Sequence, residues 1–169
     1  LLTNEDLAEA SASVGAPMVI INRFARLPNV ASLGVDFQAA TFRAATHLLN
    51  LGHSRFAYLP GPSTSENSFA RRRGIEAALR EANLSLRPEC CPVTFPNVDG
   101  GYQAMSALLA LPPCQRPTAV LAYNDLMALG ALHAIRTCGL CSPEDVSVIG
   151  ADDIAMAAHP NPPLTTIAQ

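Results

Sequence analysis

The residues best suited to chemistry lie near the carboxyl end, where the apolar run Val146–Gly150 leads through Ala151 into Asp152 and Asp153. Charge at the end of a buried strand is costly unless a partner compensates it. A metal ion, an acid–base reaction or a ligand could each be that partner. Consecutive strand residues point to opposite sides, so the two acids cannot easily face one substrate, and a two-carboxylate hydrolase needs acids separated across a cleft. A metal site would need further oxygen ligands, for which Asp125 is the obvious recruit. We therefore expect one acid to cap a turn while the other meets a ligand or an arginine.

Motifs for nucleotide binding and nucleophilic catalysis are absent from the sequence. It has no G-x-x-x-x-G-K-[ST] loop, no G-x-G-x-x-G after an expected strand and no G-x-S-x-G elbow. The histidines are best interpreted as surface or packed residues. An α/β enzyme that uses Asp125, Asp152 and Asp153 remains the weakest alternative, and the expectation is that the protein is not an enzyme.

The five cysteines do not form an evident framework. Cys138 and Cys141 have the spacing of a redox or zinc pair, but they fall at the carboxyl end of an expected helix, where the helix dipole disfavours a thiolate. Cys90 and Cys91 could join them in a zinc site, yet nothing in the sequence brings the two pairs together. We expect the cysteines to bind no metal, the protein to need no cofactor, and its location to be the reducing cytoplasm.

Three consecutive arginines lie early in another expected helix. Successive helical residues point about 100° apart, so Arg71, Arg72 and Arg73 cannot share a face. Arg71 is nearest to the helix start and is the one able to reach the edge of a neighbouring sheet. Its rigid guanidinium suits hydroxyl or carboxylate groups of a ligand, whereas the other two are expected to be solvated.

The elements that must position these residues alternate along the chain. Helical patterns cover residues 4–15, 36–52, 67–84, 99–111 and 124–139, and apolar strand patterns cover 18–22, 31–35, 55–61, 91–95, 117–123 and 143–151. This alternation predicts an α/β fold in which a parallel sheet carries helices on both faces. Ligands of such sheets bind at the carboxyl ends of the strands. The polar residues there include Asn124 and Asp125 after one strand and Asp152 and Asp153 after another.

Composition limits the classes of partner. The 169 residues are 49% hydrophobic and 15% charged, which is typical of one ordinary domain with a substantial core. The net charge is −3 and the longest basic run has three residues, so the chain offers little attraction for nucleic acid or an anionic membrane. No apolar run is long enough for a membrane span, and the N-terminus does not read as a signal peptide.

Several motifs nevertheless resemble one family of DNA-binding regulators. The segment AYNDLMALGALHAIRTCGLCSPEDVSVIGADD, followed by PPLTTI, is similar to the effector-binding core of the LacI/GalR family of bacterial transcriptional regulators. That family reads A-x-N-D-x-M-A-x-G here, then G-[FY]-D-[DN] and P-P-L-T-T-[IV]. Upstream, PMVIINR, HLLNLGHSRFAYLPGP, R-x-x-G-I-x-A-A-L and GYQAM follow in family order, so the resemblance covers nearly the whole chain.

The resemblance implies a periplasmic-binding-protein-like fold of type I, with two α/β subdomains joined by crossover strands and a small effector in the cleft. Residues 1–35 would be a remnant of the N-terminal subdomain, residues 36–162 the C-terminal subdomain, and residues 163–169 a crossover back. The family also implies a cytoplasmic homodimer that binds no membrane and reaches operator DNA only through a helix-turn-helix headpiece absent from this chain. The effector expected is a sugar or sugar-like metabolite. A solute-binding protein of a sugar uptake system, which shares the fold, is the alternative.

Family motifs also imply site residues. The arginine of R-x-x-G, the asparagine of N-D and the first acid after G-[FY] contact the effector, and they fall on Arg71, Asn124 and Asp152. An aromatic residue before GYQAM often lies over the ligand, which indicates Phe95. Two departures concern the effector's identity: Ala151 replaces a bulky aromatic, and Phe37 stands where a polar residue is common.

Overall fold

The computed structural model describes residues 3–22 and 25–169. The chain divides into two compact units, Leu1–Asp36 and Phe37–Gln169. The first unit contains helix α1 (Asn4–Val14) and the strands β1 (Met18–Ile21) and β2 (Val30–Leu33), which pair in parallel. The cap residue Gly15 ends α1 with a φ of 63°, a conformation that glycine adopts without steric cost.

The second unit is built on a parallel sheet with the strand order β3-β4-β5-β6. Its strands are β3 (Phe56–Leu59), β4 (Ala119–Ala122), β5 (Ser147–Asp152) and β6 (Thr165–Ala168). All neighbouring pairs are parallel, which confirms the predicted arrangement.

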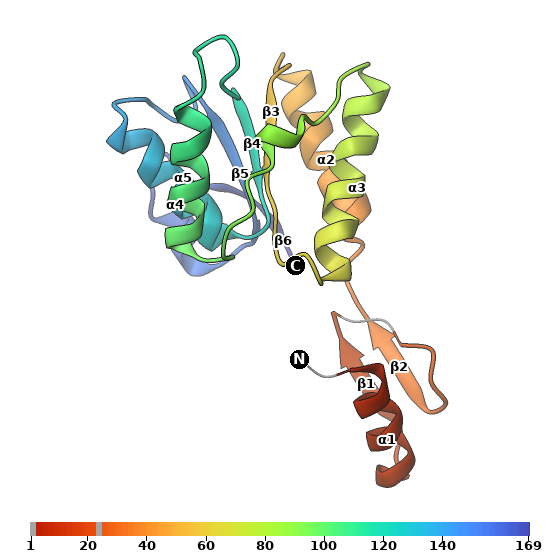
Figure 1. The fold of residues 1–169 in the computed structure, drawn as a ribbon. Helices are drawn as coiled ribbons and strands as arrows, with labels where there is room; N and C mark the ends of the chain where they lie inside the picture. The colour runs from red at the N-terminus through yellow and green to blue at the C-terminus, as the bar shows by residue number, and fades with distance from the viewer. Residues whose placement is uncertain (1–2, 23–24) are drawn as a thin grey trace. The chain divides into compact units, whose positions relative to one another are not determined.

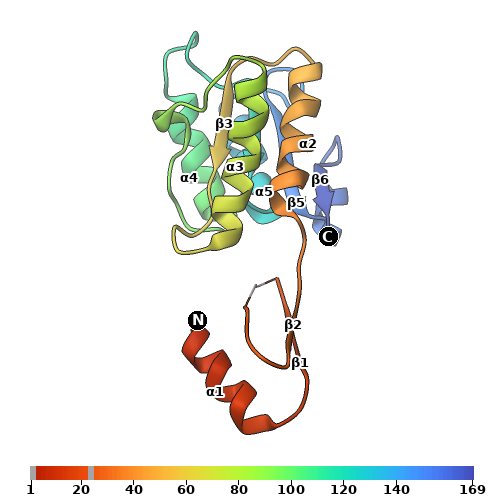
Figure 2. The ribbon, with the colours of Figure 1, turned by 90° about the vertical axis from the view of Figure 1, so that its right-hand side faces the viewer.

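Helices cover both faces of this sheet (Figures 1 and 2). Helices α2 (Phe37–Asn50) and α3 (Glu66–Glu81) lie on one face, and α4 (Val98–Leu109) and α5 (Asp125–Thr137) lie on the other. Two short 3-10 helices, η1 (Pro88–Cys90) and η2 (Ala155–Ala158), interrupt the connections. The predicted layers are therefore confirmed.

The central parts of the sheet are buried on both sides, as parallel strands between helical layers must be: every residue of β3 and β4 is buried, whereas the edge strand β6 is partly exposed. Their side chains alternate between two apolar clusters. Phe56 and Tyr58 pack in the cluster of α2 and α3, whereas Ala57 and Leu59 pack in the cluster of α4 and α5. This alternation fixes the register, because a shift of one residue would exchange the two faces.

Helices α2 and α3 approach closely at Gly74. A Cβ atom at this position would lie 2.2 Å from the carbonyl oxygen of Gln38 and 2.3 Å from the hydroxyl of Thr41. Only glycine permits this approach, which brings the middle of α3 against the start of α2. The glycine of the R-x-x-G motif thus has a packing role next to the arginine that precedes it.

One predicted strand was wrong. Residues 91–95 form no strand and follow η1 as irregular chain. Pro92 lacks the N–H group that a strand ladder would need, which accounts for the difference despite the apolar pattern. Separately, none of the helices in the described parts of the chain combines the length and the apolar character that crossing a membrane requires.

Candidate functional site

Arg71 is the most unusual side chain at the carboxyl edge of the sheet. Although charged, it is only 3% exposed. Its guanidinium carbon lies 3.8 Å from the centre of the Phe37 ring and 4.4 Å from the centre of the Tyr123 ring. Both rings offer cation–π contacts, which are stronger when the cation is desolvated. The two aromatic residues therefore hold the guanidinium while leaving its edge for other partners.

The neighbouring helix fixes the backbone of Arg71. Ser65 caps the start of α3, and the Thr41 hydroxyl of α2 donates a hydrogen bond of 2.8 Å to the Arg71 carbonyl. The next two arginines behave differently, as helical spacing predicts. Arg72 forms an exposed ion pair with Glu76 on its own helix, and Arg73 is exposed. Only Arg71 of the three is turned into the protein.

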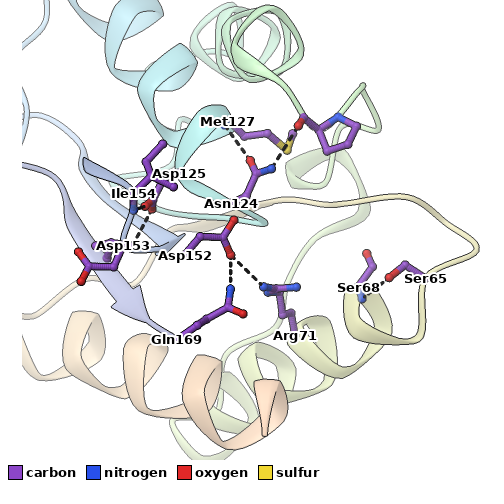
Figure 3. A network of polar contacts seen from close by, with 12 residues as sticks. Ser65, Ser68, Arg71, Asn124, Asp125, Met127, Asp152, Asp153, Ile154 and Gln169 are labelled. Carbon is purple, nitrogen blue, oxygen red and sulfur yellow. Dashed lines mark hydrogen bonds and ion pairs between the residues drawn. The ribbon is translucent and has the colours of Figure 1, made fainter. Parts of the chain in front are cut away.

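Asp152 is the acidic partner of Arg71 (Figure 3). The distance from Nη2 of Arg71 to Oδ1 of Asp152 is 3.7 Å, which is an ion pair but too long for a hydrogen bond. The side-chain amide of Gln169 donates to the same carboxylate oxygen. Within the described residues, Nε of Arg71 is buried and has no hydrogen-bond partner. A buried guanidinium with unused donors indicates a place for a hydrogen-bonding ligand.

The electrostatics of Asp152 reflect the same surroundings. Burial raises the pKa of Asp152, and the nearby Asp125 raises it further, while Arg71 and the Gln169 amide lower it. Tyr58 lies below Arg71 in the sheet, and burial raises the pKa of Tyr58 to about 12. Tyr58 therefore stays neutral at ordinary pH, and Asp152 supplies the countercharge.

The two adjacent acids diverge. Figure 3 shows the Asp152 side chain directed towards Arg71 and Asn124, and the Asp153 side chain directed away from them. Asp152 has a φ of 118° and Asp153 a φ of 55°. Positive φ values at residues other than glycine cost about 1–3 kcal/mol each and cluster at functional sites. The two acids diverge as predicted, and because both have positive φ, the backbone at the end of β5 departs from regular strand geometry where they separate.

Asn124 lies at the same edge, where its side chain already has protein partners. Its Oδ1 accepts a hydrogen bond of 2.9 Å from the Met127 N–H and so caps helix α5. Its Nδ2 donates at 3.1 Å to the Pro96 carbonyl. One amide hydrogen of Asn124 is left for another acceptor.

Phe95 lies apart from the polar side chains of Arg71, Asn124 and Asp152. Its ring is 79% exposed, and it lies in the irregular segment before α4. The hydrogen bond from Asn124 to Pro96 anchors the adjoining residue. The loop that carries Phe95 is therefore tied to the site, although no described contact joins the ring itself to Arg71 or Asp152.

Asp125, considered above as a recruit for a metal site, has a different setting. It is fully buried, and each of its oxygens accepts a hydrogen bond, one from the Thr166 hydroxyl at 2.6 Å and one from the Ile154 N–H at 3.0 Å. Among the described residues, no group of three or more His, Cys, Asp and Glu side chains is arranged to hold a metal ion. All five cysteines are free thiols.

Three residues that contact the Arg71–Asp152 pair are not among the site residues predicted from the sequence: Phe37, Tyr123 and Gln169. Strand pairing gives a usable signal for Gln169, because Asp152 pairs with Ala168 on β6 and the next residue lies at the same edge. Tyr123 directly follows β4 and precedes Asn124, so its place at the edge of the sheet follows from the strand pattern. For Phe37, no local pattern predicts the contact with Arg71.

This arrangement can bind a polar ligand by hydrogen bonds. Asp152 offers acceptors and Arg71 offers donors, while the rings of Phe37 and Tyr123 give the charged pair apolar surroundings. Hydrogen bonds to charged groups are stronger than neutral ones, and adjacent hydroxyls of one molecule can use both charges. The fold and this site together define an α/β ligand-binding domain.

Comparison with known proteins specifies the class. The profile of the periplasmic binding protein-like domain family matches residues 45–169. The chain is 39% identical over 153 residues to the HTH-type transcriptional repressor CytR of Escherichia coli K12, covering 90% of this chain and 44% of that repressor. This chain thus spans less than half the length of that relative.

Solved structures of LacI-family regulators have the same fold as this chain. A regulatory protein of the LacI family from Chloroflexus aggregans superposes with a TM-score of 0.90 at 30% identity, covering 98% of this chain and 59% of that one. A LacI family regulator from Enterococcus faecium with bound ribose gives a TM-score of 0.85 at 30% identity, covering 99% of this chain and 61% of its own. The chain belongs to the periplasmic-binding-protein-like family, in the form of the effector-binding domain of LacI-family transcriptional regulators.

Proposed function

We propose that this chain is the ligand-sensing part of a regulator that binds a sugar or sugar-like effector and thereby changes its affinity for operator DNA. The observation that carries the proposal is the Arg71–Asp152 pair. Arg71 is buried between two aromatic rings, and the Asp152 carboxylate at 3.7 Å balances its charge. Its Nε has no hydrogen-bond partner within the described residues. A ligand with neighbouring hydroxyls would complete these hydrogen bonds.

The proposed site residues have distinct roles. Asp152 accepts hydroxyl hydrogens, Arg71 donates to ligand oxygens, and Asn124 donates its free amide hydrogen. Phe95, exposed beside the anchored Pro96, covers the apolar face of a bound ring. The ribose bound to the Enterococcus faecium regulator supports a sugar as the ligand class. No residue here is assigned a catalytic role, and we propose that the protein is not an enzyme.

The proposal extends to the whole regulator. Residues 1–35 belong to one effector subdomain, residues 36–162 to the other and residues 163–169 to a crossover. The intact protein is a cytoplasmic homodimer that contacts DNA through a separate headpiece. The named repressor among the relatives supports this function over uptake of a solute, for which the relatives described above provide no support.

The proposal is tested with the full-length gene product. Ribose, glucose and sucrose are each added in a thermal-shift assay, and the binding sugar is then added to the protein on its operator. We expect one sugar to raise the melting temperature and to change operator affinity. Stabilisation without any change in DNA affinity would favour a solute-binding protein, and no stabilisation by any sugar would contradict the proposed ligand class.

A further inference from the structure

The buried Asp125 is connected to the strained turn that carries Asp152. Its Oδ2 accepts from the Ile154 N–H at 3.0 Å, two residues beyond Asp152. Its Oδ1 accepts from the Thr166 hydroxyl at 2.6 Å. The same hydroxyl oxygen accepts from the Asp153 N–H at 3.3 Å. Two backbone N–H groups directly after Asp152 are thus held, one directly and one through Thr166, by a single carboxylate.

The sequence around Asp125 is adapted to this arrangement. Gly150 pairs with Thr166 across β5 and β6, and a Cβ atom at Gly150 would lie 2.1 Å from Oδ1 of Asp125. The carboxylate therefore occupies the space that a side chain at position 150 would fill. Asp125 is the first residue of α5, where the helix dipole favours a negative charge. Asp125 is 0% exposed, so it cannot itself contact a ligand that enters from solvent.

Resting on the function proposed above, we infer that Asp125 is a positioning residue: it clamps the turn after β5 so that the Asp152 carboxylate faces Arg71. The φ of 118° at Asp152 is unfavourable for an L-residue and needs surrounding contacts to persist. Directly after Asp152, the backbone is held by the hydrogen bonds from the Asp153 N–H to Thr166 and from the Ile154 N–H to Asp125. Figure 3 shows Asp125 beside Ile154. Without these hydrogen bonds the turn can relax, and Asp152 moves away from Arg71.

The test uses the full-length protein with Asp125→Asn and Thr166→Val, and with Thr166→Ser as the matched control. Asparagine keeps the shape of Asp125 but cannot accept both hydrogen bonds, and valine keeps the shape of threonine without its hydroxyl. Serine retains the hydroxyl. Crystal structures report the φ of Asp152 and its distance to Arg71, and calorimetry with ribose reports affinity. A merely stabilising role would lower melting temperatures without moving Asp152.

We expect Asp125→Asn to shift Asp152 away from Arg71 and to weaken ribose binding by roughly tenfold or more. Thr166→Val should act in the same direction, and Thr166→Ser should behave like the unmodified protein. If Asp125→Asn does not fold, Thr166→Val decides the question. Asp152 unmoved in the folded variants would overturn the clamp. Failure of the unmodified protein to bind ribose would count against ribose as the ligand and not against the positioning role of Asp125, because the crystal structures test that role independently.

Discussion

At the scale of single residues, a buried guanidinium defines this molecule's chemistry. Arg71 is enclosed by Phe37 and Tyr123 and is balanced by a carboxylate that is itself half-buried. Removing one member of a buried pair leaves an uncompensated charge, which costs more than the pair contributes. The site is therefore sensitive to the protonation of Asp152 and to the rings around Arg71.

The affinity for a hydroxylated ligand should fall in acid. Burial raises the pKa of Asp152 above the ordinary aspartate value of 3.8, and only the ionised form accepts hydrogens at both oxygens. As pH falls through this raised pKa, protonated Asp152 loses acceptor capacity and affinity declines. Calorimetry at a series of pH values from neutral downwards checks this. The decline should be absent in Asp152→Asn, and an equal decline in that variant would assign the effect to another group.

The ring of Phe37 should matter although it offers no hydrogen bond. Phe37→Leu removes one cation–π face from Arg71, a contact of about 0.5–2 kcal/mol, so ligand affinity should fall by roughly two- to thirtyfold. Phe42→Leu on the same helix, partly buried against the core, is the control. Titration of both variants with the bound sugar measures the difference. Equal affinities of Phe37→Leu and Phe42→Leu for the sugar would show that Tyr123 alone orients Arg71.

At the scale of elements, close packing of α2 and α3 supports the site. Gly74→Ala would place a Cβ atom 2.2 Å from the Gln38 carbonyl, so the helices must separate. Such overpacking typically costs about 1–3 kcal/mol. We expect a lower melting temperature for Gly74→Ala and little change for Arg72→Ala, which loses only an exposed ion pair. An unchanged melting temperature in Gly74→Ala would show that the contact is easily relieved.

The elements were largely predictable from the sequence, and the contacts between them were not. Apolar strand patterns and helix caps such as Asn124 are local signals, so β3, β4, β5 and α5 were expected near their observed positions. The apolar pattern of residues 91–95 wrongly predicted a strand, because Pro92 lacks the N–H group that pairing in a sheet requires.

Within the site, local patterns placed Arg71 and Asp152 at one edge of the sheet. The stacking of Phe37 on Arg71 and the role of Asp125 depend on tertiary distances. No spacing along the chain encodes those distances.

At the scale of the whole molecule, the charge of residues 1–169 offers little attraction for DNA. The printed sequence has a net charge of −3, and its longest basic run has three residues. Affinity for DNA depends on neutralising phosphates, so residues 1–169 alone should show no specific binding at physiological salt. Fluorescence anisotropy with operator DNA checks this, with the full-length protein as the positive control. A nanomolar complex with residues 1–169 would show that these residues themselves contact DNA.

We expect Asp152, and not its neighbour Asp153, to bind the ligand together with Arg71. Calorimetry of the full-length protein, Asp152→Ala and Asp153→Ala with the sugar that binds tests it most directly. Loss of a hydrogen bond to a charged group costs about 1.5–3 kcal/mol, so Asp152→Ala should weaken binding by roughly ten- to a hundredfold. Asp153→Ala should change affinity much less, because its side chain is directed away from the site. Equal losses in the two variants, or unchanged affinity in Asp152→Ala, would contradict this assignment.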